Sequence, residues 1–154
     1  MSSQTLINES YAALETVLRA QLAGVRIEPL TAGDLDVESG KIIAKPPAVL
    51  LVFRREELAP QNQAGLLYSS RQNYMVICGA ENLRSLDAER IGALELLGRV
   101  ADVLARAKLT LQATPEPVFV ELRRVELAQM ELEGTWYSIE VELLGYSSYS
   151  GVAA

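Results

Sequence analysis

Histidine is absent from the 154-residue sequence, and cysteine occurs only once. The absence of histidine excludes catalytic triads built on it and removes the most common general base and zinc ligand. The single cysteine, Cys78, cannot form an intrachain disulfide, and its place in the apolar run 74–78 predicts a small buried side chain in a strand. Glycine-rich phosphate-binding motifs and the GxSxG motif of hydrolases are missing as well. We therefore expect a structural protein and no enzyme.

Long apolar runs and clusters of basic residues are also lacking. No apolar run approaches the ~18–20 residues that span a bilayer, and residues 1–4 lack the basic and apolar regions of a secretion signal. We therefore expect a soluble protein, made in a reducing cytoplasm and without a membrane partner. The formal net charge is −6, and without a basic run the surface offers little to hold nucleic-acid phosphates. An acidic wall would, however, let DNA slide past without sticking.

Carboxylates at alternate positions make residues 34–40 the best metal candidate. Asp34, Asp36 and Glu38 are spaced so that they could converge on a hard cation. An EF-hand loop needs glycine at its sixth position and glutamate at its twelfth, whereas Gly40 is seventh here and Lys45 is twelfth. We expect a solvated acidic loop, with a calcium site as the alternative, and no cofactor.

A second group of carboxylates lies near the end of the sequence. Glu121, Glu126, Glu140 and Glu142 could be read as containing an acid–base pair. Because Arg123 is expected on the neighbouring strand, we predict cross-strand ion pairs on a solvated sheet face instead.

The first elements follow from the spacing of apolar side chains. Residues 4–23 carry them at steps of three or four, which is one face of a helix. These side chains are Ile7, Tyr11, Leu14, Leu18 and Leu22. Gly24 suits the left-handed position that ends a helix. Residues 25–28 are then predicted to form a short strand, stopped by Pro29, and the turn-rich residues 31–40 a loop.

The middle of the sequence predicts a hairpin. Residues 48–53 are apolar on both faces, which is typical of a central strand covered on each side, and the prolines of 46–47 precede its ladder. Polar residues 54–64 are predicted to form a protruding loop or hairpin tip. The chain returns as a strand over residues 67–78, polar near the loop and apolar beyond it. We expect this hairpin to project beyond the compact body.

A second helix is predicted over residues 86–108. One charged stripe runs along it, made of Glu95, Arg99, Asp102 and Arg106. Its two acid-first i,i+4 pairs are worth ~0.2–0.5 kcal/mol each. The remaining faces are broadly apolar, as in a helix that packs across a sheet.

A final hairpin is predicted over residues 118–129 and 132–144, turning near Glu133-Gly134. Alternation along residues 137–143 indicates a half-buried strand. On its partner the apolar parity changes at Arg123-Arg124, where we predict a β-bulge. Residues 145–154 are too poor in large apolar groups for a core element and are predicted to form an arm.

The expected element order is α-β-ββ-α-ββ. It describes an α+β fold in which two helices pack on a mostly antiparallel mixed β-sheet. The length suits one domain, residues 1–144, followed by the arm. A hydrophobic fraction of 49% is high for so small a monomer, so neighbouring subunits are expected to cover some of this surface.

Three stretches resemble the Mu-type phage tail terminator family. Residues 45–52 look like its proline-led apolar strand, and residues 74–84 are similar to its strand with a following Asn-Leu-Arg turn. Residues 88–109 match its long second helix. With the first helix, the likeness extends from about residue 5 to residue 144.

The resemblance implies a fold similar to the lambda-type terminator and a homohexameric ring. Such a ring docks on the last ring of the tail tube protein, stops tube polymerisation and presents a surface to the head–tail connector. In a contractile tail it also meets the sheath protein. Genomic DNA would only pass through the lumen, and the protein would reside in the tail or neck of the virion after assembly in the host cytoplasm.

Chain position and composition suggest where such a ring makes its contacts. Residues 54–72 are predicted to form an axial contact region, and residues 145–154 an arm to the adjacent subunit. The candidate interface residues are Arg54, Arg55, Gln61, Asn62, Arg71, Trp136, Tyr146 and Tyr149. The three aromatic residues are read either as local hydrophobic anchors or as subunit contacts.

Other functions stay open from the sequence. Another neck or head–tail connector protein of the same particle would have a similar composition. A small cytoplasmic α+β enzyme would need a pocket with perturbed carboxylates or with Lys41 or Lys45. A regulatory domain whose sheet binds a ligand or peptide is the last alternative.

Overall fold

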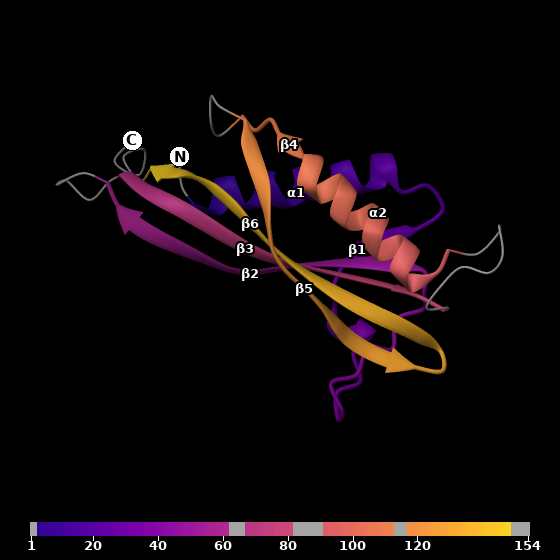
Figure 1. Cartoon of the computed structure of the whole chain (residues 1–154). Helices are drawn as coiled ribbons and strands as arrows, with labels where there is room; N and C mark the ends of the chain where they lie inside the picture. The colour runs from indigo at the N-terminus through magenta and orange to yellow at the C-terminus, as the bar shows by residue number, and fades with distance from the viewer. Residues whose placement is uncertain (1–2, 62–66, 82–90, 113–116, 149–154) are drawn as a thin grey trace.

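The computed structural model describes residues 3–61, 67–81, 91–112 and 117–148. Within these residues two α-helices cover one face of a six-stranded mixed sheet (Figure 1). In chain order the elements are α1 (Ser3–Gln21), β1 (Arg26–Pro29), the 3₁₀ turn η1 (Ala32–Asp34), β2 (Ala48–Pro60), β3 (Leu67–Ala80), α2 (Ala93–Arg106), β4 (Lys108–Leu109), β5 (Val118–Glu131) and β6 (Gly134–Ser148). The predicted fold class and order are confirmed, with β4 as an addition.

The strand order across the sheet is β1-β2-β3-β6-β5-β4. β1 pairs with β2 in parallel, and every other neighbouring pair is antiparallel. The two hairpins β2–β3 and β5–β6 therefore lie side by side, with β3 and β6 in the centre. These central strands pair along their whole length, from Leu67 opposite Ser148 to Ala80 opposite Thr135.

The main core lies between the helices and the sheet. Much of it comes from α1, from α2 and from the helix-facing side of β3 and β6: Leu6, Leu14, Leu18, Leu96, Val100, Leu104, Tyr74, Val76, Ile139, Val141 and Leu143. Gly24, three residues beyond the end of α1 at Gln21, has the predicted left-handed conformation with φ +78°. The charged stripe of α2 faces outward, with Arg99 bound to Glu95 at 2.7 Å and Arg106 to Asp102 at 3.4 Å.

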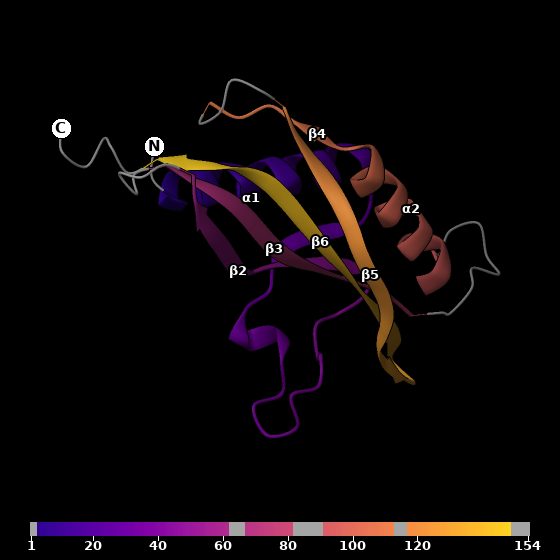
Figure 2. The same cartoon turned by 60° about the vertical axis from the view of Figure 1, so that its left-hand side comes forward.

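A smaller apolar cluster lies on the opposite face of the sheet. The segment between β1 and β2 lies on this side, away from the helices (Figure 2). It places Leu30, Ile42 and Ala44 against Ala48, Leu50 and Trp136. The residues at the start of β2 are thereby buried on both faces, as their unbroken apolar run predicted.

The prediction of a loop at residues 54–64 is wrong over its described part. β2 continues through this polar stretch to Pro60 and stays paired with β3, from Arg55 opposite Asn73 to Pro60 opposite Tyr68. The hairpin also does not project alone, because β6 pairs with β3 throughout. On the helix side, Gln72 donates from Nε2 to Oγ of Ser10 in α1 at 3.3 Å.

The ends of two further elements differ from the prediction. β6 extends to Ser148, so residues 145–148 are a strand paired with β3 and not part of an arm. α2 begins at Ala93 after an N-cap at Gly92 and ends at Arg106. Residues 86–90 of the predicted helix lie outside the described residues. Among the described residues, neither α1 nor α2 has the length and hydropathy that a membrane-spanning helix requires.

Candidate assembly surfaces

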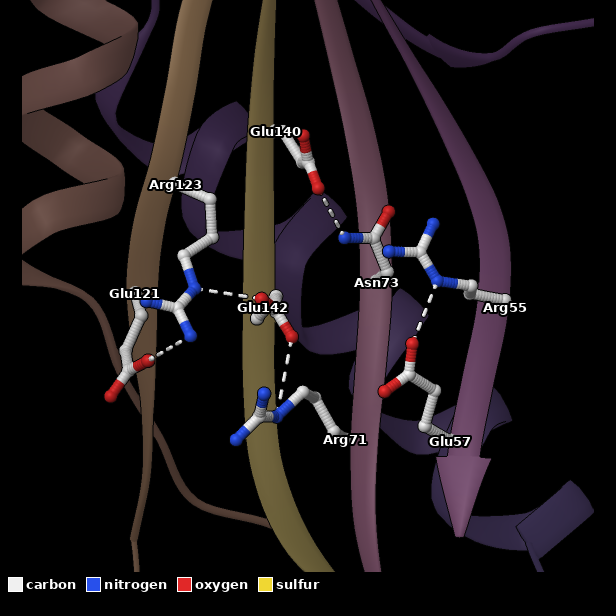
Figure 3. A network of polar contacts seen from close by, with 8 residues as sticks. All are labelled: Arg55, Glu57, Arg71, Asn73, Glu121, Arg123, Glu140 and Glu142. Atoms are coloured by element: carbon white, nitrogen blue, oxygen red, sulfur yellow. Dashed lines mark hydrogen bonds and ion pairs between the residues drawn. The ribbon is translucent and has the colours of Figure 1, made fainter.

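No segment among the described residues covers one half of the sheet face opposite the helices, and we call this half the open face (Figure 2). It is built by β5, β6, β3 and β2 and carries charged and amide side chains (Figure 3). Its members are Arg55, Glu57, Arg71, Asn73, Glu121, Arg123, Glu140 and Glu142. These residues alternate with the core residues of the same strands, so the core-forming pattern itself places them there.

Glu142 is the centre of this face. Its carboxylate accepts a hydrogen bond from Nε of Arg123 at 2.7 Å and lies 3.4 Å from Nε of Arg71. The side chain is only 10% exposed, although both arginines reach solvent. The bond to Glu142 raises the pKa of Arg123, whose guanidinium also lies 3.9 Å from Glu121. The carboxylate is therefore shared by two cations from the flanking strands.

The predicted cross-strand ion pairing is confirmed for Arg123 with Glu142, whereas the contact of Arg123 with Glu121 lies within β5. Glu140 instead accepts a hydrogen bond from Nδ2 of Asn73 at 2.9 Å. Within the described part of the chain the Glu126 carboxylate has no ion pair and accepts no hydrogen bond. The bulge predicted at Arg123 is present as a register shift between Leu122 and Arg124, and a second shift follows between residues 127 and 129.

The acidic loop uses its carboxylates locally. Asp34 accepts hydrogen bonds from the amide and hydroxyl groups of Thr31, at 2.8 and 3.1 Å. Asp36 accepts the amide protons of Glu38 and Ser39, and these bonds lower its pKa. Among the described residues no cluster of three or more acidic or thiol side chains is arranged to hold a metal ion.

A cavity of about 370 Å³ lies between this loop and the tip of the β5–β6 hairpin. Its polar walls include Lys41, which bonds Glu131 at 2.9 Å, and Gln129. The Gln129 amide accepts the Ile42 amide proton at 2.7 Å and donates to the Ile42 carbonyl at 2.9 Å. The groups around the cavity thus bond one another and fix the loop to the hairpin.

The structure brings some of the predicted contact residues together. Arg55 and Arg71 share the open face, where Arg55 bonds Glu57 at 3.2 Å. Arg54 is exposed at a register shift in β2, between Phe53 and Arg55. Gln61 is exposed just after β2, and its backbone N–H donates to the Leu67 carbonyl. Asn62 lies outside the described residues.

The aromatic candidates are separated. Trp136 and Tyr146 lie ten residues apart on β6, about 33 Å in an extended strand. Trp136 is only 2% exposed and belongs to the smaller apolar cluster, so it has almost no surface to offer another subunit. Tyr146 is 60% exposed near the other end of β6. Tyr149 lies outside the described residues.

The sequence reasoning missed the exposed edge of the sheet at β5. Residues 121–128 are all exposed, and the large apolar side chains exposed on β5 and its turn are Phe119, Leu122, Val125, Leu127, Met130 and Leu132. Residues 54–59 and 123–128 share the pattern Arg-Arg-x-Glu-Leu-Ala and differ at one position. This recurrence is the signal that would have assigned residues 54–59 to a strand like their counterpart.

These features define a small α+β protein with one mixed sheet, a polar open face and exposed sheet edges. Residues 5–137 match the protein-family model described as Bacteriophage Mu, Gp37. Because the match covers most of the chain, the protein belongs to this bacteriophage family, and the resemblance seen in the sequence is confirmed. The family points to a structural, tail-related phage protein and to a component of the virion. No curated protein matches the chain.

Proposed function

We propose that this protein is the tail terminator of a bacteriophage. Copies of the chain form a ring, which we expect to be a homohexamer, that caps the tail tube and stops its polymerisation. The ring then joins the tail to the head–tail connector and, in a contractile tail, also meets the sheath protein. The observation that carries the proposal is the family match over residues 5–137.

The exposed surfaces are consistent with repeated contacts between identical copies. A ring needs two different patches on each subunit, because head-to-tail contacts close only when one patch fits the other. The edges at β2 and β5 lie on opposite sides of the sheet. Both carry exposed apolar side chains, including Leu58 on β2 and Leu127 on β5. Such residues are favoured where a partner covers them.

The charge of the chain supports a passive relation to DNA. The net charge is −6, and Arg71 and Arg123 of the open face both bind Glu142 of the same face. An acidic protein whose face has most of its cations paired gives phosphate groups little to bind. We propose that the genome passes through the ring without a specific contact.

Tail length distinguishes a terminator from another neck protein. We would stop translation of this chain in the phage and image particles from infected cells by negative stain. A terminator predicts headless tails with overlong tubes, restored to normal length when the protein is supplied from a plasmid. Headless tails of normal length would identify a connector instead, and normal particles would contradict both functions.

A second experiment uses purified components. Tube protein polymerising in the presence of this chain is expected to stop at a length that falls as the chain is added, with rings visible at tube ends. Bovine serum albumin at equal concentration is the control. Tubes that keep growing with the chain bound nowhere would contradict the capping role.

A further inference from the structure

The two hairpins carry nearly the same segment on their outer strands. β2 contains Arg-Arg-Glu-Glu-Leu-Ala at residues 54–59, and β5 contains Arg-Arg-Val-Glu-Leu-Ala at residues 123–128. In both strands the register shifts at the first arginine, Arg54 or Arg123. We call these the β2 edge segment and the β5 edge segment. They occupy opposite sides of the β3–β6 centre.

Both segments have an unpaired outer side in the described structure. β1 pairs with β2 only over residues 48–51, and β4 pairs with β5 only over residues 118–119. No other described strand adjoins residues 52–60 or 120–131 on their outer sides. An edge strand presents a row of free N–H and C=O groups, which is a template for a strand from another chain.

Strand direction determines how two copies can join through these edges. β2, β3, β6 and β5 are successively antiparallel, so β5 runs opposite to β2. Copies in a ring are related by rotation, which keeps the relative direction of these strands. β5 of one copy would therefore run opposite to β2 of the next copy, as it does within one copy. The joint would be antiparallel, and the open faces of the two copies would be continuous.

The charges of the two segments are complementary in this direction. In each segment arginines come first and a glutamate follows, so antiparallel alignment sets the basic end of one against the acidic part of the other. One register places Arg55 opposite Glu126 and also Glu57 opposite Arg124. A parallel alignment of the same segments would oppose arginine to arginine, which is destabilising between neighbouring strands.

The four side chains lie on the same face of the sheet. Arg55 and Glu57 are on the open face (Figure 3). Arg124 of β5 is the backbone register partner of Glu140 on β6, which is a residue of the open face. Glu126 follows two residues later on β5 and therefore lies on the same side of the sheet. On the opposite face, the same register brings Leu58 near Leu122, and both are exposed, at 42% and 37%.

The charges at the β5 edge are also free to take part. Within the described residues, neither Arg124 nor Glu126 has a side-chain hydrogen bond or ion pair. Arg55 and Glu57 bond each other at 3.2 Å, two residues apart on one strand and about half exposed. Such an exposed pair is worth little and exchanges easily for cross-strand partners.

We propose that the β5 edge segment of one copy pairs antiparallel with the β2 edge segment of the next, through Arg55–Glu126 and Glu57–Arg124. The sheets of all copies then form one continuous sheet around the ring. This inference rests on the ring proposed above and names the surface that closes it.

Cysteine cross-linking tests the pairing directly. Two full-length proteins in a Cys78→Ala background, Glu57→Cys and Arg124→Cys, would carry different tags and be mixed under mild oxidation. Residues that face each other on neighbouring strands have the Cα separation that a disulfide needs. We expect a disulfide-linked dimer that carries both tags. Ala105→Cys, exposed on α2, is the control and should give no mixed dimer with either variant.

Each other outcome overturns the pairing. A strong disulfide-linked dimer of Arg124→Cys with itself would mean that two β5 edges pair with each other. Such a dimer of Glu57→Cys with itself would mean that two β2 edges pair. Rings seen by electron microscopy without the mixed dimer would retain the ring and refute this joint. Tubes that terminate normally while the chain never forms rings would keep the capping role but refute the ring and, with it, this joint.

Charge reversal tests the same joint without cysteines. Arg55→Glu and Glu126→Arg each set like charges across the joint and are expected to weaken self-association about tenfold, corresponding to ~1.4 kcal/mol per contact. The double variant restores an opposite pair and is expected to recover most of the loss. Circular dichroism checks that each variant is folded. Folded single variants that associate normally, or a double variant weaker than both, would refute the Arg55–Glu126 contact.

Discussion

The indole ring of Trp136 packs directly against the backbone of Gly79. The two residues are opposite each other on β6 and β3. A Cβ at Gly79 would lie 2.3 Å from Cδ2 of Trp136 and 2.4 Å from Cε3, closer than real Cβ atoms approach. Glycine is therefore needed at position 79 for the indole to reach Ala48 and Leu50 in the smaller apolar cluster.

Gly79→Ala is expected to destabilise the protein by ~1–3 kcal/mol, the range for overpacking a well-filled core. The measurement is the free energy of unfolding in urea. Gly98→Ala is the matched control, because nothing lies within 4 Å of its Cβ position on the exposed side of α2. That variant should gain about 0.5–1 kcal/mol from helix propensity. A neutral Gly79→Ala would mean that the indole moves away without cost.

The elements that the sequence predicted well are those with one buried face. The helix steps ending at Leu22 and the alternation around Ile139 each reflect a single apolar surface against one core. The prediction of a loop over residues 54–60 was wrong for the opposite reason. Its residues are exposed or only partly buried on both faces, so no apolar alternation marks them as a strand. Residues 145–148 were missed because backbone pairing with β3, which needs no particular side chain, holds them.

The positions of the candidate contact residues could be predicted only where the type of side chain itself indicates exposure. Arg55 and Arg71 are exposed on one face, as their charges suggested. The burial of Trp136 depends on Gly79, 57 positions earlier, and on the segment before β2. Such long-range packing leaves no mark in the local pattern of one sequence. The sharing of Glu142 by two arginines depends in the same way on the β3–β6 register.

Burial of Cys78 predicts how stability changes with pH. Burial raises the pKa of this thiol from 9.0 to about 12. The folded protein thus holds the thiol proton more tightly than the unfolded chain does. The free energy of unfolding that this difference contributes is complete below pH 9 and is lost as pH rises toward 12. The expected slope is about 1.4 kcal/mol per pH unit in that window. Burial raises the pKa of Tyr74 too, which adds to the loss above pH 10.

The measurement is urea unfolding at pH 8 to 10.5 for the natural chain and for Cys78→Ala, whose stability should fall less steeply. At pH 8 a thiol reagent should react with Cys78 only on unfolding. In the Cys78→Ala background, an exposed cysteine introduced as Ala105→Cys should react at once. Equal slopes for the two proteins, or fast labelling of folded Cys78, would contradict the burial of this side chain.

The amide of Gln129 fixes the loop before β2 to the tip of the β5–β6 hairpin. Gln129→Glu keeps an acceptor for the Ile42 amide proton but cannot donate to the Ile42 carbonyl, with which it makes a 2.9 Å bond. The expected loss is ~1–3 kcal/mol, with faster hydrogen exchange at the Ile42 amide. The same substitution at Gln112, which is exposed, should change neither quantity. Unaltered exchange at Ile42 would show that other contacts hold the loop.

Glu142 is expected to contribute more to stability than any exposed acid on the open face. Its side chain is 10% exposed and serves both Arg71 and Arg123, whereas the side chain of Glu121 is 45% exposed and lies 3.9 Å from Arg123 alone. Glu142→Gln removes the ion pair of Arg71 and leaves Arg123 only its longer contact to Glu121, at an expected cost of ~1–3 kcal/mol. Glu121→Gln should cost at most about 0.5 kcal/mol. Because screening acts mainly on exposed pairs, 0.5 M salt should reduce the Glu121 effect proportionally more. Equal costs for the two variants in urea unfolding would mean that the shared carboxylate gains nothing from its position between the two arginines.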